Sequence, residues 1–170
     1  MTKIILAFPC LGKTHYAQNN PERALDLESS DYLFDRTGYE HLTSEEFKGI
    51  PDRKPKENGV SDYIEAIHKA VESKQYDFVF TAQNPEIVRG IIAKGHSVII
   101  VKPYATDEAK QVFTERARAR GNNDTWINNV LKFISADPDQ FYSDDELQNI
   151  SLLKVSGNMY LTDIIKNKLV

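Results

Sequence analysis

Five short runs of apolar residues divide the chain, and segments with helical patterning separate them. The runs occupy residues 3–8, 23–28, 77–81, 97–101 and 151–155. Between two of them, Ile64, Ile67 and Val71 recur at the spacing of one helix face. Apolar strands of this kind are buried on both faces, and strands that alternate with helices form parallel sheets. The sequence therefore predicts an α/β fold, a three-layer sandwich around a five-stranded parallel sheet.

The size and composition of the chain narrow its class. With 170 residues, it is long enough for one domain with a buried core, which we expect to span 1–170. A net charge of −4 gives nucleic acids and acidic membranes little attraction, so neither is an expected partner. The single cysteine, Cys10, excludes an intrachain disulfide framework and favours a reducing, cytoplasmic location. No apolar run approaches the roughly 20 residues that a membrane-spanning helix needs.

The first apolar run leads into AFPCLGKT, which matches the phosphate-binding motif G-x-x-x-x-G-K-[ST] except that Ala7 replaces the first glycine. In such a loop, backbone N–H groups and the lysine bind phosphate oxygens, and the hydroxyl residue binds Mg²⁺. Gly12, Lys13 and Thr14 supply these parts, and alanine can replace the first glycine if φ is negative there. The nucleotide-binding residues predicted from this motif are Pro9, Cys10, Leu11, Gly12, Lys13, Thr14 and His15.

Two alternatives remain open for this stretch. Cys10 is expected to be a small loop residue rather than a nucleophile, because no partner base lies near it in sequence. The stretch as a whole is either a phosphate site or an ordinary strand-to-helix turn that binds no nucleotide. Its place after the first strand favours the phosphate site, because ligands bind at the carboxyl ends of parallel strands.

The stretch AFPCLGKTHYA, followed by the strand ALDLESS, resembles the start of small P-loop kinases of the nucleoside-monophosphate-kinase-like group, which includes shikimate- and gluconate-kinase-type enzymes. These kinases often carry an acidic D-x-D near the end of the second strand, where this chain has Asp26-Leu27-Glu28. The resemblance implies that Asp26 and Thr14 hold magnesium and that Glu28 and Ser29 face the acceptor. Alternation along a strand points residues 26 and 28 to the same side. The alternative is an edge strand with one solvated face.

The segment 106–122 occurs where such kinases have a helical lid, and it contains the sequence TERARARGNND. A kinase must neutralise charge on the phosphoryl group in transfer. Arg116 and Arg120 share one helix face, while Arg118 points elsewhere, so Arg116 and Arg120 are the predicted catalytic cations. The alternative is a solvated charged helix.

The polar segment 29–59 is long for a connection without structure, which suggests an acceptor-binding insertion, with disorder as the alternative. Its aromatic residues could stack on a base or pack against each other. They are Tyr32, Phe34, Tyr39 and Phe47. Arg89, on the helix after the third strand, is a candidate for an acceptor phosphate or a surface residue.

Two departures from the kinase pattern stand out. The third strand ends in Phe80-Thr81-Ala82-Gln83, without the aspartate of a Walker B motif, so Mg²⁺ would depend on Thr14, Asp26 and water. The D-G-[FY]-P-R sequence of adenylate-kinase-type enzymes is also absent.

The histidines lack ligand spacing and are expected to be structural or exposed rather than metal-binding. They are His15, His41, His68 and His96.

Three functions follow from these patterns. The leading one is an ATP-dependent kinase that uses Mg²⁺ and transfers the γ-phosphoryl group to a small acceptor, a nucleotide or nucleoside, with Lys13, Asp26, Glu28, Arg116 and Arg120 as its catalytic residues. Ala7 and the missing Walker B aspartate favour instead a nucleotide-binding regulatory or interaction protein whose catalysis has decayed. A 5′-hydroxyl polynucleotide kinase is third, because the chain is acidic and lacks a basic patch.

Overall fold

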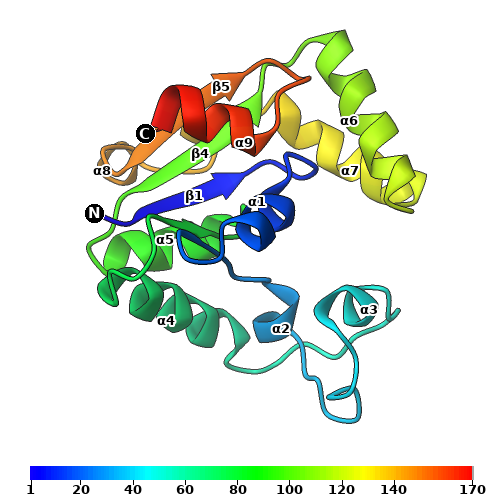
Figure 1. Ribbon diagram of the computed structural model, residues 1–170, viewed down its shortest axis with the longest axis vertical. Coiled ribbons are helices and arrows are strands. Elements are labelled where there is room, and N and C mark those ends of the chain that lie inside the picture. Colours follow the sequence, from blue (N-terminus) through cyan, green and yellow to red (C-terminus); the bar gives the residue numbers. More distant parts are fainter. Residues whose placement is uncertain (170) are drawn as a thin grey trace.

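The computed structural model describes residues 1–169, and its centre is a parallel five-stranded sheet in the order β2-β3-β1-β4-β5 (Figure 1). The strands are β1 (Lys3–Ala7), β2 (Ala24–Asp26), β3 (Phe78–Phe80), β4 (Val98–Pro103) and β5 (Ile150–Val155). Every neighbouring pair is parallel. The predicted five-stranded parallel sheet is confirmed, with strand ends that differ from the expected runs by at most two residues.

Helices cover both faces of this sheet. They are α1 (Lys13–Asn19), α2 (Ser30–Leu33), α3 (Ser44–Lys48), α4 (Gly59–Glu72), α5 (Pro85–Ala93), α6 (Asp107–Ala119), α7 (Asp124–Ile134), α8 (Asp144–Leu147) and α9 (Leu161–Ile164), with a 3-10 turn at Pro138–Gln140 and a π-helical turn at Ile165–Leu169. Buried residues of α4 and α5 form one core, and those of α1, α6, α7 and α9 form the other. The three-layer sandwich is therefore confirmed. None of the helices within residues 1–169 is long and apolar enough to cross a membrane.

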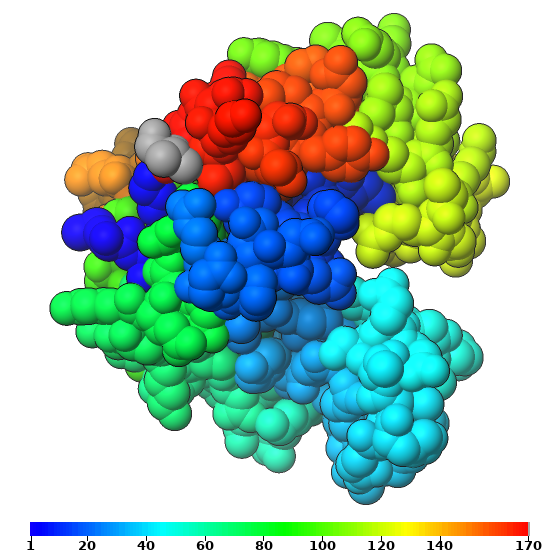
Figure 2. Space-filling view, viewed as in Figure 1, coloured from blue at the N-terminus to red at the C-terminus, as the bar shows by residue number. Residues whose placement is uncertain are grey.

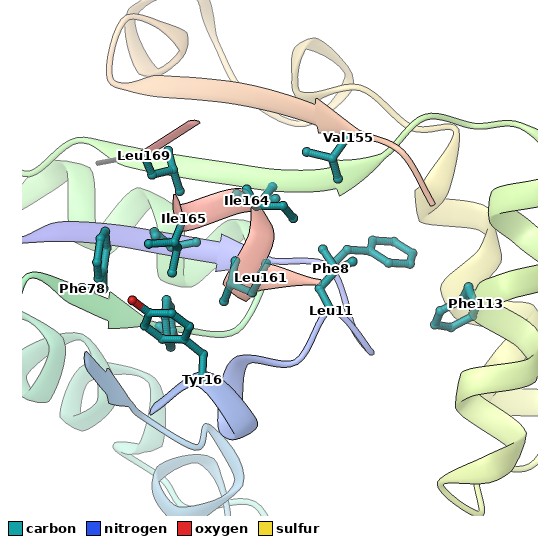
Figure 3. Packing of buried hydrophobic residues seen from close by; sticks show 14 of the residues in the cluster. Phe8, Leu11, Tyr16, Phe78, Phe113, Val155, Leu161, Ile164, Ile165 and Leu169 are labelled. Atoms are coloured by element: carbon teal, nitrogen blue, oxygen red, sulfur yellow. The ribbon is translucent and has the colours of Figure 1, made fainter. Parts of the chain in front are cut away.

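The central strand β1 supplies side chains to both cores. Ile4 and Leu6 pack into the core under α4 and α5, while Ile5 and Ala7 pack into the core on the other face. This follows from the two-residue period of a strand, and it explains why the run is apolar throughout rather than alternating. On the α1 and α9 face, Phe8 extends from the loop after β1 toward Phe113 of α6 (Figure 3).

The register of the sheet aligns the strand ends that carry the predicted site. Asp26 is level with Phe80 of β3, and Phe80 is level with Ile5 of β1. Because the strands are parallel, the loops after β1, β2 and β4 all emerge from one edge of the sheet, where α/β proteins bind their ligands. Asp26 is therefore placed beside the start of the loop that follows β1.

The segment 29–59 folds into α2, α3 and an antiparallel bridge between Phe34 and Pro55. It has a small core of its own, since Phe47 is fully buried and the guanidinium of Arg36 lies 4.7 Å from the centre of its ring. Phe47 therefore packs in the protein interior and is not available to stack on a base. Tyr39 remains partly exposed and lies 5.9 Å from Phe47 between ring centres.

The segment 106–122 forms α6 and the turn that ends it. The Thr106 side chain caps the helix by accepting a hydrogen bond from the N–H of Ala109, and Gly121 follows the helix at a φ of +82°. Ala117 is fully buried and Phe113 nearly so, which fixes one face of α6 against the core. If α6 closes over a ligand, Phe113 and Ala117 must therefore either move together with the core residues that they contact or shift relative to them.

Candidate nucleotide and acceptor site

The loop between β1 and α1 has the backbone shape of a phosphate cradle. Cys10 has a φ of +64° and Gly12 a φ of +90°, while Leu11 between them stays on the negative side. Alternation of this kind turns successive N–H groups toward one point, which makes a concave anion site. Gly12 also begins α1 by accepting a hydrogen bond of 2.9 Å from the N–H of Tyr16, so the helix dipole adds to the attraction. Glycine is needed at Gly12, where the left-handed backbone would strain another residue.

Ala7 fits the position of the missing first glycine. It ends β1, is 1% exposed and pairs with Val101 of β4 in ordinary extended backbone. The φ of Ala7 is not positive, so a methyl group carries no backbone penalty there. The loss of the first glycine therefore leaves the loop intact.

Contacts on both sides hold the cradle in place. The N–H of Phe8 donates a hydrogen bond of 2.8 Å to Val101, and the carbonyl of Leu11 accepts one of 2.8 Å from Leu161. The ring of Phe8 meets the ring of Phe113 edge-on, with 5.3 Å between centres. The loop is thus shaped before any ligand arrives, which lowers the entropic cost of binding an anion.

Lys13 is the first residue of α1 and lies at the mouth of this loop. Its ammonium donates a hydrogen bond of 3.2 Å to the carbonyl of Ala7, across the loop. Burial lowers the pKa of Lys13. The negative charges of Asp26 and Glu28 oppose that shift, and the positive charge of Arg120 adds to it. The charge around the Lys13 ammonium therefore comes from the carboxylates of Asp26 and Glu28 and from the cations Arg120 and Lys48.

The next residue, Thr14, joins the loop to the end of β2. Its hydroxyl donates a hydrogen bond of 2.7 Å to the Asp26 carboxylate. Burial raises the pKa of Asp26, and the Thr14 hydrogen bond and the charge of Lys13 act against that rise. A hydroxyl and a carboxylate side by side are oxygen donors that fit Mg²⁺, which binds one or two protein oxygens and keeps several waters.

Glu28, two residues after β2, is held by two neighbours. One carboxylate oxygen accepts hydrogen bonds from the N–H and hydroxyl of Ser30, at 3.2 and 3.0 Å, and the other pairs with the ammonium of Lys48. Burial alone would raise the pKa of Glu28, but Lys48 and Ser30 hold it below its ordinary value. Ser29 contributes its carbonyl, which accepts from Tyr32 and Leu33 and so starts α2.

Arg120 lies at the other wall of the site, at the end of α6. Its guanidinium lies 3.6 Å from the Cys10 sulfur and 4.0 Å from the Glu45 carboxylate of α3. It therefore connects the phosphate cradle, α6 and the insertion. Figure 2 shows the insertion, in cyan, and the yellow-green α6–α7 region on either side of a notch, with the blue N-terminal segment behind it.

Arg116 reaches the cradle indirectly. It donates hydrogen bonds to the carbonyls of Asn158 and Met159, at 2.8 and 3.3 Å, and its guanidinium lies 3.8 Å from the centre of the Tyr160 ring. That ring is next to Gly12, because a Cβ at Gly12 would lie 3.5 Å from it. The structure thus brings Arg116 to the rim of the loop but engages it with the segment after β5.

One predicted residue, Arg89, lies apart from this group. Arg89 donates to Glu146 at 3.1 Å and packs on Tyr142, toward β5, whereas Glu28 follows β2 at the opposite end of the strand order. The structure therefore does not bring Arg89 together with Glu28 and Ser29. His15 is exposed on α1, where its backbone carbonyl accepts a hydrogen bond of 2.8 Å from Asn19.

Sequence reasoning missed Lys48, Glu45 and Tyr160. Lys48 and Glu45 belong to a five-residue helix inside a polar segment, where no motif marks them. The sequence Thr43-x-x-Glu46 is a capping box that predicts the start of that helix, and both of its hydrogen bonds form. It does not indicate which residues the helix contacts. Tyr160 lies just before α9, and its contact with Gly12 depends on the chain's return to the sheet edge after β5.

Comparisons with known proteins agree with this architecture. No protein-family model matches the chain, and no curated sequence matches it. Its structure is similar to that of the tunicamycin resistance protein of Deinococcus radiodurans, at 15% sequence identity and a TM-score of 0.56, over 98% of this chain and 92% of that one. Likeness at this identity concerns the fold. The chain thus has a P-loop kinase-like fold, with the Cys10–Gly12 loop after the first strand of a five-stranded parallel sheet.

Proposed function

We propose that this protein is an ATP-dependent kinase that uses Mg²⁺ and transfers the γ-phosphoryl group to a hydroxyl of a small acceptor. The observation that carries the proposal is the 2.7 Å hydrogen bond between Thr14 and Asp26, beside Lys13. It brings a hydroxyl, a carboxylate and an ammonium to a shaped phosphate cradle. Asp26, from β2, thereby supplies the carboxylate that the third strand lacks.

The residues of the cradle have separate tasks in this reaction. The loop N–H groups and Lys13 bind the phosphate chain, and Thr14 and Asp26 are the residues that would hold Mg²⁺. When bound, Mg²⁺ neutralises charge on the phosphate oxygens. Arg120 lies at the lip of the loop, where a guanidinium stabilises charge on the phosphoryl group during transfer. Arg116 keeps the segment after β5 against the loop.

Glu28 is the group we assign to the acceptor. An acceptor hydroxyl beside it would give its proton to the carboxylate while its oxygen bonds to the γ-phosphorus. The bond from that phosphorus to the bridging oxygen then breaks, and ADP leaves with the electron pair. We propose a nucleotide or nucleoside in this role, since Lys48, beside Glu28, and Arg120, beside Cys10, are cations that suit a phosphate group.

An assay of ADP release across nucleosides, nucleotides and small hydroxy acids tests the proposal. Tunicamycin belongs in the panel, because the similar structure is named for resistance to it. Lys13→Ala should abolish acceptor-dependent release without loss of fold, and Lys132→Ala, at an exposed lysine of α7, is the matched control. If Lys13→Ala keeps turnover within about tenfold, roughly 1.4 kcal/mol of barrier, the cradle is not the catalytic site.

A nucleotide-binding protein without transfer is the second candidate. The observation in its favour is that both carboxylate oxygens of Glu28 are already engaged, by Ser30 and Lys48. Glu28→Gln separates the two functions. In a kinase it should lower turnover by about 10²- to 10⁴-fold and leave ATP affinity nearly unchanged, as for loss of a general base. Tight ATP binding that needs no Mg²⁺, with no transfer to any acceptor, would favour the second candidate.

A further inference from the structure

Two histidines and a glutamate, residue types that can ligate a metal, meet far from the phosphate cradle. His68 and Glu72 belong to α4, and His96 lies in the turn between α5 and β4. One donor atom from each lies within 4.8 Å of the other two. His96 comes two residues before β4 begins, so the cluster is at the amino ends of the strands, whereas the cradle follows their carboxyl ends (Figure 1).

Local structure aims these side chains at one another. His68 and Glu72 are four residues apart on α4 and so share a face of the helix. Gly95 ends α5 at a φ of +84°, with the N–H of Gly95 bonded to Ile92 and that of His96 to Ile91. This is the pairing of a Schellman motif, which fixes the direction of the residue after the glycine. His96 is therefore held toward α4 by the backbone.

The distances suit a small divalent ion. Nδ1 of His68 and Nε2 of His96 are 2.8 Å apart, so one ring donates a hydrogen bond to the other, and the ring planes make an angle of 44°. Two imidazole nitrogens on tetrahedral zinc stand about 3.3 Å apart, given Zn–N distances of about 2.0–2.1 Å. An opening of about 0.5 Å, which side-chain rotation can supply, would replace the shared proton by a metal ion.

Glu72 has the properties of the third ligand. It is exposed, and it takes part in no ion pair within residues 1–169. Lys94, at the end of α5, pairs instead with Glu65 at 2.9 Å. Because Glu72 is at the surface, a water molecule has access to the remaining coordination position.

We propose that His68, Glu72 and His96 bind Zn²⁺ and tie the end of α4 to the turn between α5 and β4. Two imidazoles and one carboxylate are ligands that zinc prefers, whereas Mg²⁺ takes oxygen ligands. The site is thus chemically distinct from the Thr14–Asp26 pair. Bound zinc stabilises the native state, because the unfolded chain does not hold these three groups together.

Zinc titration of chelator-treated protein, without nucleotide, tests this proposal. The native chain should bind one Zn²⁺ at this cluster. His68→Gln, His96→Gln and Glu72→Gln should each weaken that binding by at least about tenfold, because even outer-shell partners of metal ligands contribute that much. His41→Gln, in the insertion, is the matched control and should bind zinc as the native chain does. A zinc concentration about a hundredfold above Kd should raise Tm by about 5–10 °C in the native and control proteins only.

Three results would overturn the proposal. One is zinc affinity in the cluster variants equal to that of His41→Gln. Another is no rise in Tm with zinc in the native chain. The third is loss of zinc binding in Asp26→Asn but not in His68→Gln, which would place the ion at the cradle. Glu72→Gln guards against misfolding, because its side chain is exposed and its metal-free Tm should equal that of the native protein.

Discussion

Lys48 of α3 forms an ion pair with Glu28, two residues after β2, and so joins the insertion to the edge of the sheet. Each side chain is less than a third exposed, so the pair is only partly screened by water. Lys48 and Ser30 hold the pKa of Glu28 below its ordinary value against the effect of burial. Glu28 therefore stays ionised, and so free of a proton, at a lower pH than an exposed glutamate would, while the same ion pair makes it a weaker base.

Lys48→Met should therefore change the pH dependence of the kinase. With Lys48 removed, burial acts on Glu28 with less opposition, so its pKa rises and the acidic limb of kcat/KM moves to higher pH. A depressed carboxyl pKa stabilises the fold above the unfolded-state value, and this stability is lost as pH falls through the folded-state pKa. The variant should accordingly lose about 1–2 kcal/mol at neutral pH and less in acid, by urea unfolding.

Lys56→Met is the control for this variant, because Lys56 also forms an ion pair, but with Asp62 of α4 at 2.6 Å. Its pH profile should match that of the native chain. If the acidic limb of kcat/KM in Lys48→Met lies at the same pH as in Lys56→Met and in the native chain, Glu28 does not titrate in the rate-determining step.

Asp26→Asn should separate activity from stability. Asparagine can still accept the Thr14 hydrogen bond, but it removes the charge that we assign to Mg²⁺, so turnover should fall by orders of magnitude and depend less on magnesium. The folded-state pKa of Asp26 is raised by burial, so the ionised form costs stability above its unfolded pKa. The free energy of unfolding at neutral pH should therefore stay constant or rise. Full turnover in this variant would remove Asp26 from the mechanism.

The sequence predicts the parts of this site that local rules determine. AFPCLGKT is a contiguous motif after an apolar strand, so the cradle, Lys13 and Thr14 follow from spacing alone. Asp26 follows nearly as directly, because a parallel sheet brings strand ends to one edge. The number of strands in the sheet can be predicted from the number of apolar runs alone.

The remaining contacts depend on how distant segments close on each other. Lys48 reaches Glu28 only because α2 and α3 fold back as a unit. Arg89 of α5 pairs with Glu146 of α8, which lies 57 residues further along the chain. His68 and His96 are 28 residues apart, so no ligand spacing marks them in the sequence. Their contact depends on the packing of α4 on α5 and on the left-handed conformation of Gly95. Residue spacing in the sequence predicts neither of these.

Arg120 and Arg118 form a matched pair for testing the charge on α6. Arg120 approaches Cys10 and Glu45, whereas Arg118 pairs with Asp124 at the surface at 3.0 Å. Arg120→Met should lower kcat by about 10²- to 10³-fold, as for loss of one donor to the reacting group. Arg118→Met should leave steady-state kinetics almost unchanged. Equal effects of the two substitutions would show that net charge, and not position, accounts for the loss.

Helix α6 is the segment that we expect to tighten when nucleotide binds. One of its faces is fixed by Phe113 and Ala117, but Arg120 is half-exposed at the lip of the cradle and can move onto a phosphate. Phosphate binding would then draw the end of α6 toward the loop and exclude water, as closing segments do in other enzymes.

Amide hydrogen exchange in residues 106–120 should slow on saturation with a non-hydrolysable ATP analogue and Mg²⁺. Exchange in α4, on the other face of the sheet, should not change. Lys13→Ala at the same analogue concentration should show no protection in α6, because its phosphate site is lost. Unchanged exchange in 106–120 of the native chain, with the analogue bound, would make α6 a fixed wall of the site instead of a lid.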